Sequence, residues 1–145
     1  MPTARQVANY LLKFAAEHGD CLTNLKLQKL LYYAQAWHLA LYDSPLFDDK
    51  FEAWVHGPVI RPLYGHFKEF GWQPITKWGE PTGITASQKK HLQEVFAEYG
   101  KYSAWDLERM THSESPWKIA RGNLPSDVES RSLISEAEMK KYYRP

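Results

Sequence analysis

The sequence has little of several features that would place it in a particular functional class. It contains one cysteine, Cys21, in 145 residues, so an internal disulfide is excluded and the disulfide-framed secreted class is not supported. Lysine and arginine number 18 against 17 aspartates and glutamates, a net charge of +1, which gives no field for nucleic acid or acidic membranes. The early apolar stretch from Tyr10 to Ala16 is interrupted by Lys13 and is too short to cross a membrane. We therefore expect a cytoplasmic protein with no nucleic-acid or membrane partner.

Motifs of the common catalytic and metal-binding classes are also missing. The sequence has no phosphate-binding glycine loop, no closely spaced cysteine pair and no His-Glu-x-x-His. None of the six histidines lies within helical ligand spacing of another: they are His18, His38, His56, His66, His91 and His112. A metal site would need long-range assembly, so we expect no cofactor and no metal.

Aromatic residues are the one class in excess. Six tryptophans, nine tyrosines and six phenylalanines make up 14% of the chain. Side chains of this size dominate hydrophobic cores, and tryptophan and tyrosine are also the preferred anchors of protein interfaces. The excess is compatible with a binding module and with an ordinary core.

The most apolar segment, Thr23 to Leu41, predicts a central helix. One stripe of a helical wheel collects Leu27, Leu30, Leu31, Ala34, His38 and Leu41. A second stripe holds Gln28, Tyr32, Gln35 and Leu39, and the side that we expect to face solvent holds Lys26, Lys29 and Tyr33. A helix apolar around most of its circumference is covered on most sides. The amides and phenol of the second stripe then need hydrogen-bond partners inside the protein or on another protein.

Helix-start signals and turn residues complete the predicted architecture. Four hydroxyl residues precede a side-chain acceptor by three positions, the spacing of a capping box or its Asp variant: Thr3 with Gln6, Thr85 with Gln88, Ser103 with Asp106, and Ser135 with Glu138. Leu46-Phe47 and Phe51 to Val55 flank Asp48-Asp49 and predict a short hairpin that Gly57-Pro58 ends. Residues 1–145 should form a single, mainly α-helical domain of about six to seven helices around a central buried helix, with one two-stranded β-hairpin.

Two histidines leave a catalytic alternative open. His56 precedes the Gly-Pro pair, and His112 lies in a polar segment between two short helices, so a small enzyme could combine them with Glu52 or Glu114. We favour an architectural reading, in which polar groups of that segment satisfy helix ends and Trp117 fills the core. A second alternative is a DNA-binding regulator that uses the N-terminal helical hairpin. That use requires an exposed second helix.

Three segments carry a family resemblance. KLQKLLYYAQAWHLAL at Lys26 to Leu41, PLFDDKFEAWVHGPVIRPLY at Pro45 to Tyr64, and THSESPW at Thr111 to Trp117 closely resemble the Panacea domain. This is the SocA-like antitoxin family, which also includes phage-associated GepA-type proteins. The resemblance covers nearly the whole chain, and the order and spacing of three separate motifs make it specific.

The resemblance implies an antitoxin of a type II toxin-antitoxin system, which neutralises a cognate toxin by direct protein-protein binding and is not itself an enzyme. The partner would be the protein toxin encoded by the adjacent gene. The resemblance leaves open two further interactions. One is delivery of the toxin to a ClpXP-type protease, and the other is a homo-oligomer of this chain within the toxin complex. Our candidate toxin-binding residues are Lys26, Gln28, Lys29, Tyr32, Tyr33, Gln35, His56 and Arg61. The residues that match the family pattern, assigned mainly to architecture, are Trp54, Gly57, Pro58, Tyr64, Thr111, His112 and Trp117.

Overall fold

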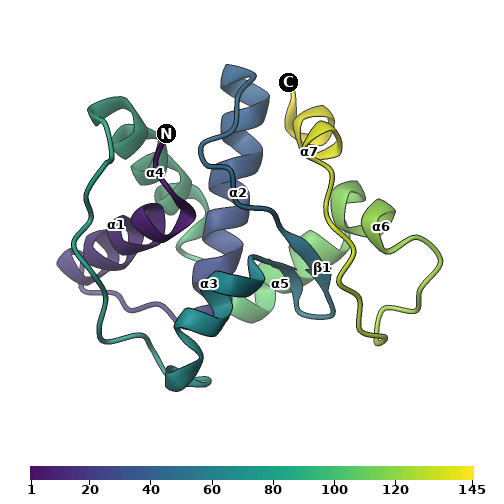
Figure 1. The fold of residues 1–145 in the computed structure, drawn as a ribbon, viewed down its shortest axis with the longest axis horizontal. Coiled ribbons are helices and arrows are strands. Elements are labelled where there is room, and N and C mark those ends of the chain that lie inside the picture. Colours follow the sequence, from purple (N-terminus) through teal and green to yellow (C-terminus); the bar gives the residue numbers. More distant parts are fainter.

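A long helix, α2, runs through the middle of the protein and is surrounded by the other elements (Figure 1). The computed structural model describes all 145 residues. The elements are α1 (Ala4–Glu17), α2 (Asn24–Tyr42), β1 (Glu52–Trp54), β2 (Gly57–Val59), α3 (Arg61–His66), the 3-10 helix η1 (Lys68–Phe70), α4 (Ala86–Tyr99), α5 (Ala104–His112), α6 (Ser115–Arg121) and α7 (Glu136–Tyr143). The predicted fold class is confirmed: the domain is mainly helical, with seven α-helices of which α2 is the central one, and one two-stranded antiparallel hairpin. None of the helices combines the length and the hydropathy that crossing a bilayer requires.

The predicted helix starts are confirmed. Thr3 and Thr85 form complete capping boxes with Gln6 and Gln88, because each hydroxyl accepts from the N3 backbone N–H and each amide accepts from the cap N–H. The hydroxyls of Ser103 and Ser135 likewise accept from the N3 backbone N–H groups of α5 and α7. These side chains satisfy donors that the first helical turn leaves unpaired.

The central helix α2 is buried on more sides than its sequence predicts. It packs against α1, α4, α5, α7 and β2, and Figure 1 shows α1 and α4 on one side of it and α6 and α7 on the other. The prediction that Lys29 and Tyr33 face solvent is wrong, since both are 0% exposed. Lys26, on the same side, is half-buried and donates to the Gly100 carbonyl at 2.7 Å. That side of α2 is covered by α5 and β2 and by the link between α4 and α5.

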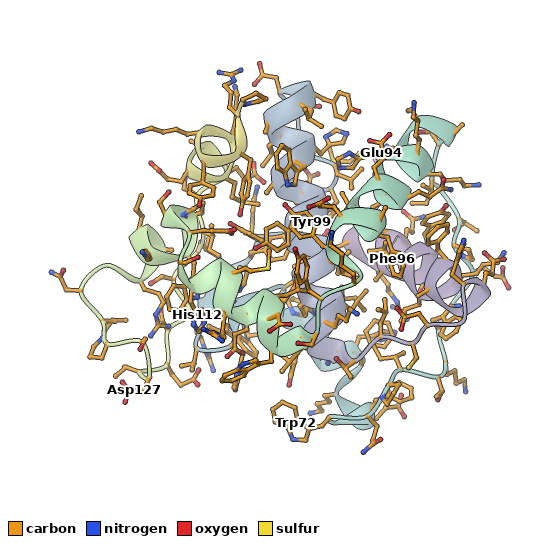
Figure 2. The ribbon with its side chains drawn as sticks, turned by 180° about the vertical axis from the view of Figure 1, so that it is seen from behind. Trp72, Glu94, Phe96, Tyr99, His112 and Asp127 are labelled. Atoms are coloured by element: carbon orange, nitrogen blue, oxygen red, sulfur yellow. The ribbon has the colours of Figure 1, made fainter.

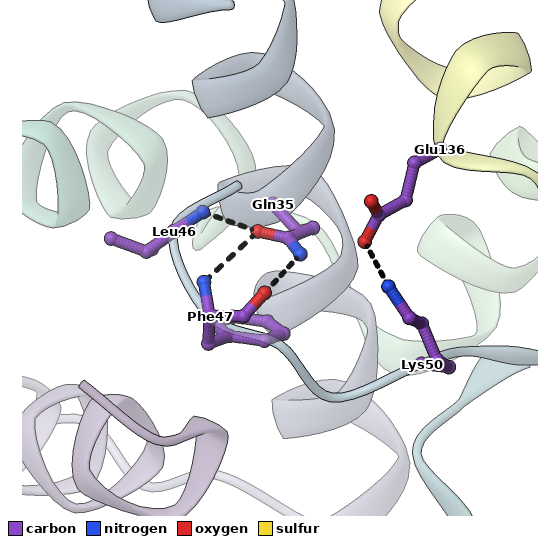
Figure 3. A network of polar contacts seen from close by, with 5 residues as sticks. All are labelled: Gln35, Leu46, Phe47, Lys50 and Glu136. Carbon is purple, nitrogen blue, oxygen red and sulfur yellow. Dashed lines mark hydrogen bonds and ion pairs between the residues drawn. The ribbon is translucent and has the colours of Figure 1, made fainter. Parts of the chain in front are cut away.

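Buried amides of α2 fasten the neighbouring loops. The Gln35 side chain accepts from the Leu46 N–H at 2.7 Å and donates to the Phe47 carbonyl at 2.7 Å (Figure 3). Two turns earlier along the same stripe, Gln28 Oε1 accepts from the Ile60 N–H at 2.9 Å. Both amides therefore bond to backbone groups of the protein itself and hold neighbouring loops in place. The Gln28 amide nitrogen and the Tyr32 hydroxyl of the same stripe are buried and have no hydrogen-bond partner within the protein.

The β-hairpin differs from the predicted one. β1 pairs with β2, with Ala53 opposite Pro58, across a turn at Val55 and His56. The predicted pairing of Leu46-Phe47 with Phe51 to Val55 is wrong, and Gly57-Pro58 begins the second strand instead of ending the hairpin. Alternation of Phe51, Ala53 and Val55 identified the first strand correctly, but a Gly-Pro pair conceals a strand because proline cannot donate to a ladder.

The C-terminal segment covers the other edge of β1. The Ala53 N–H donates to the Ser132 carbonyl and the Ile134 N–H donates to the Phe51 carbonyl, both at 2.8 Å. α7 then packs along α2, where Tyr143 contacts the rings of Trp37 and Tyr33. This coverage gives the small hairpin the packing that a two-stranded ribbon needs to persist.

Candidate partner-binding groove

A groove of about 380 Å³ lies where the start of α2, the hairpin turn, the end of η1 and α5 meet. We call it the indole groove because two tryptophans line it. Its lining residues are Thr23, Leu25, His56, Gly71, Trp72, Ala104, Trp105 and Glu108. The largest apolar side chains of the groove, Trp72 and Trp105, are exposed to water, and an exposed patch of large apolar side chains is informative.

The two indoles are the most exposed tryptophans of the protein. Trp72 is 70% exposed and Trp105 is 64% exposed. Trp72 follows η1 directly and lies at the edge of the molecule, below α5 in Figure 2. Trp105 occupies the second position of α5, on the side of the helix away from the buried Leu107 and Thr111. Neither indole belongs to the hydrophobic core.

A hydrogen bond between His56 and Glu108 forms the polar part of the groove. His56, in the turn between β1 and β2, has its Nδ1 atom 3.0 Å from Glu108 Oε1, and its ring meets Trp72 edge-on with 6.1 Å between ring centroids. The Glu108 side chain is 15% exposed and the His56 side chain 47% exposed. α5 places Glu108 three residues after Trp105, which is the spacing that brings two side chains to one face of a helix.

A buried lysine lies behind His56 and Glu108. Lys29 donates from Nζ to the Pro58 carbonyl at 3.2 Å, and a Cβ atom on Gly57 would stand 2.7 Å from Lys29 Cε and 2.9 Å from Thr111 Oγ1. Burial lowers the pKa of Lys29 to about 7, with the negative charge of Glu108 opposing the shift. α2, β2 and α5 therefore meet at a tightly packed point directly below the hairpin turn.

Side chains of the motif between α5 and α6 pack against one another and against β1, and the assignment of this motif to architecture stays a prediction. The His112 ring stacks on Trp117 with 4.0 Å between centroids, and the Trp117 indole donates to the Trp54 carbonyl at 2.8 Å. Arg121 donates to the Ala53 carbonyl at 2.9 Å. Burial lowers the pKa of His112, which favours its neutral form. These contacts tie α6 to β1, and His112 lies within this packing in Figure 2.

Tyrosines and a glutamate form a second internal polar cluster. Tyr33 donates to the Glu114 carboxylate at 3.1 Å, Tyr143 donates to the same carboxylate, and Tyr33 stacks on Tyr99 with 4.0 Å between centroids. Burial raises the pKa of Glu114, while the two phenol donors act in the opposite direction. The cluster joins α2, α4, α6 and α7, and it has the satisfied hydrogen bonds of a structural network.

The predicted toxin-binding residues fall into two groups. Lys26, His56 and Arg61 are at least partly exposed, and Arg61 pairs with Glu52 at 3.1 Å. The others are at most 1% exposed: they are Gln28, Lys29, Tyr32, Tyr33 and Gln35. A partner contact by any residue of the first group stays a prediction. A buried side chain reaches no partner in this conformation, so the second group could affect binding only by shaping the surface.

The residues of the two alternative functions are arranged differently from the predictions. Glu52 binds Arg61 and the Trp54 indole, and Glu114 binds tyrosines, so the predicted combination of these carboxylates with His56 is wrong. His56 pairs instead with Glu108. α2 is buried along most of its faces, which excludes its use as a DNA-recognition helix.

Only His56 of the groove was a predicted site residue, and the other seven lining residues were missed: Thr23, Leu25, Gly71, Trp72, Ala104, Trp105 and Glu108. A signal for two of them was present. Trp105 stands off the apolar stripe of its helix, and Trp72 follows a glycine at the head of a loop rich in proline and glycine. A large aromatic residue with no place in a periodic pattern is a candidate for an exposed anchor.

Comparisons with known proteins agree with the motifs. Residues 27–118 match the family described as antitoxin SocA-like, Panacea domain. The chain is 34% identical to "Antitoxin SocA" of Caulobacter vibrioides (strain NA1000 / CB15N) over 129 residues, which cover 80% of this chain and 69% of that relative. No solved structure matches the chain. The family match spans most of α2, the hairpin, α3 to α5 and the packing of His112 on Trp117.

Proposed function

The chain belongs to the SocA-like antitoxin family of Panacea domains, and from that premise we propose that it neutralises a cognate protein toxin by binding it directly, with the indole groove at the centre of the contact. The proposed partner is the toxin encoded by the adjacent gene. The chain would convert no substrate.

The observation that carries the choice of surface is the exposure of two tryptophans in one groove, 70% for Trp72 and 64% for Trp105. Tryptophan is the residue most enriched among interface hot spots, where burial of one side chain contributes about 2 kcal/mol or more. A stable complex buries on the order of 1,200–2,000 Å² in total. The groove would therefore form the centre of a larger contact, and we propose that the partly exposed Lys26 and Arg61 contribute to it.

Co-expression with the adjacent gene tests the proposal. We expect the intact chain to restore growth to cells that express the neighbouring product and to co-purify with that product. Replacing both indoles, Trp72→Ser with Trp105→Ser, should weaken the complex at least about 100-fold and abolish rescue, with little change in thermal unfolding because neither indole belongs to the core. A neighbour that is harmless alone, or that stays toxic beside the intact chain, would refute the antitoxin proposal.

A matched control separates a specific contact from general loss of apolar surface. Ile119 is 55% exposed on α6 and does not line the groove. The variant Ile119→Ser should keep both rescue and complex formation. Equal losses in this variant and in the double tryptophan variant would count against the groove as the contact surface.

The fate of the toxin separates two forms of the proposal. Neutralisation by occlusion leaves the amount of toxin in the cell unchanged. Delivery to a ClpXP-type protease shortens the toxin half-life in the presence of this chain and restores it when the protease is deleted. A pulse-chase measurement of the toxin, with and without the protease, decides between them.

A further inference from the structure

The indole groove has the chemistry of a receptor for a cation. Among its lining residues only Glu108 carries a formal charge when His56 is neutral. One carboxylate oxygen, Oε1, faces His56 Nδ1 at 3.0 Å, and the other, Oε2, accepts no hydrogen bond from the protein. The side chain is 15% exposed, so a partner group that enters the groove would cover an anion whose hydrogen bonding is incomplete.

The protein supplies little internal compensation for that anion. Lys29 is the nearby cation, and it is fully buried with Nζ directed to the Pro58 carbonyl. Because burial lowers its pKa to about 7, a large fraction of Lys29 is uncharged near neutral pH. An aliphatic anchor from a partner would cover Glu108 without replacing its water, which is unfavourable.

The tryptophans select among cations. Indole rings attract a cation over their faces, and this attraction grows when water is excluded. A guanidinium is flat, stacks on aromatic rings and offers parallel N–H donors that match the two oxygens of a carboxylate, whereas an ammonium is a compact and strongly hydrated point charge. His56 is 47% exposed, so its bond to Oε1 can be given up to a stronger donor at low cost.

We propose that the indole groove receives an arginine side chain of the partner protein, held against Trp72 and Trp105 and bonded to the Glu108 carboxylate. This inference rests on the proposed function, because it identifies the chemistry by which the same groove recognises the toxin. It assigns Glu108 as a specificity-determining residue and the tryptophans as the source of most of the buried area.

A peptide titration tests the guanidinium without the toxin. The probe is a short capped peptide that contains one arginine, and the matched control carries citrulline, which has the same shape and no charge. The readout is the pair of indole N–H resonances of Trp72 and Trp105. We expect the arginine peptide to shift both resonances with millimolar affinity, the citrulline peptide to bind at least about tenfold more weakly, and Glu108→Gln to remove the difference. Equal binding of the two peptides, or an arginine preference that survives in Glu108→Gln, would overturn the inference.

The toxin complex gives a second readout with its own control. Glu108→Gln should weaken the complex about 10- to 100-fold, whereas Asp106→Asn should change it little, because Asp106 is an exposed carboxylate of the same helix that does not line the groove. If the intact chain binds the toxin and Glu108→Gln binds equally well, the arginine anchor is wrong and the proposed function stands. If the intact chain does not bind the neighbouring product, the proposed function fails, and the peptide titration still decides the chemistry of the groove.

Discussion

Gly57 lies so close to Lys29 that a Cβ atom on the glycine would stand 2.7 Å from the lysine Cε. The contact joins the first residue of β2 to the second turn of α2, below the turn that carries His56. The position of His56 in the groove therefore depends on the absence of a side chain at Gly57, the next residue in the chain.

Gly57→Ala should destabilise the protein by about 2–4 kcal/mol, because the new methyl group meets Lys29 and Thr111 and because φ is +94° at this position. Urea unfolding measures the change. Gly65→Ala is the control: this glycine lies in α3 with no atom within 4 Å of an added Cβ, and alanine should stabilise the helix by up to about 1 kcal/mol. Similar effects of the two substitutions would show that the packing at Gly57 is looser than described.

Tyr33→Ala should cost about 3–5 kcal/mol of stability, because Tyr33 is 0% exposed, stacks on Tyr99 and donates to Glu114. Tyr142→Ala, at a tyrosine 45% exposed on α7, should cost less than about 1 kcal/mol. Thermal and urea unfolding of the two variants check this. A Tyr33→Ala variant that unfolds like the intact protein would return this tyrosine to the list of surface contacts.

Helix bounds were predictable from the sequence, whereas the burial of Lys29 and Tyr33 was not. Capping residues such as Thr3 and Thr85, and stops such as Gly100, act through local hydrogen bonds and backbone preferences, so the helix bounds were predictable. The surroundings of Lys29 are set by β2 and α5, which are distant in sequence. A lysine is usually exposed, so its presence in the sequence gives no signal that it is buried. The hairpin register failed for a related reason, since Pro58 looks like a strand breaker until its partner Ala53 is known.

The candidate site was predictable only at His56. Its partner Glu108 comes from a helix 52 residues away, and Trp72 and Trp105 reach the same groove from two other segments. No periodic pattern connects these four residues. The family motifs also give little help, because Trp54, Gly57, Pro58, Thr111 and Trp117 do not line the groove.

Gln35→Leu should destabilise the protein by about 2–5 kcal/mol, because it leaves the buried Leu46 N–H and Phe47 carbonyl without partners (Figure 3). The same figure shows the ion pair of Lys50 with Glu136 at 2.9 Å, whose side chains are 52% and 31% exposed. Lys50→Ala should cost less than about 1 kcal/mol. The denaturation midpoints of the two variants measure the loss of stability at a buried amide and at a surface ion pair. A larger loss in Lys50→Ala than in Gln35→Leu would contradict the prediction.

Lys29 should make stability rise with pH above neutrality. Burial lowers its pKa from 10.5 to about 7 in the folded protein, whereas the unfolded chain keeps the proton until near 10.5. The folded state therefore binds fewer protons between these values, and the free energy of unfolding should increase with pH by up to about 1.4 kcal/mol per unit. Buried tyrosines set the upper limit, because burial raises the pKa values of Tyr32, Tyr33 and Tyr143 and their unfolded forms ionise near pH 10, which reverses the trend.

The measurement is the urea unfolding free energy at three pH values between about 7.5 and 9.5, a window below the ionisation of unfolded tyrosine. Lys29→Met keeps the length of the side chain, removes the titrating group and should flatten the dependence. Lys89→Met, at an exposed lysine of α4, retains Lys29 and should keep the rise. A dependence that is equally steep in Lys29→Met would mean that another group releases the proton and that Lys29 remains charged within the fold, in which case Glu108 is compensated from behind and its demand for a partner cation is weaker.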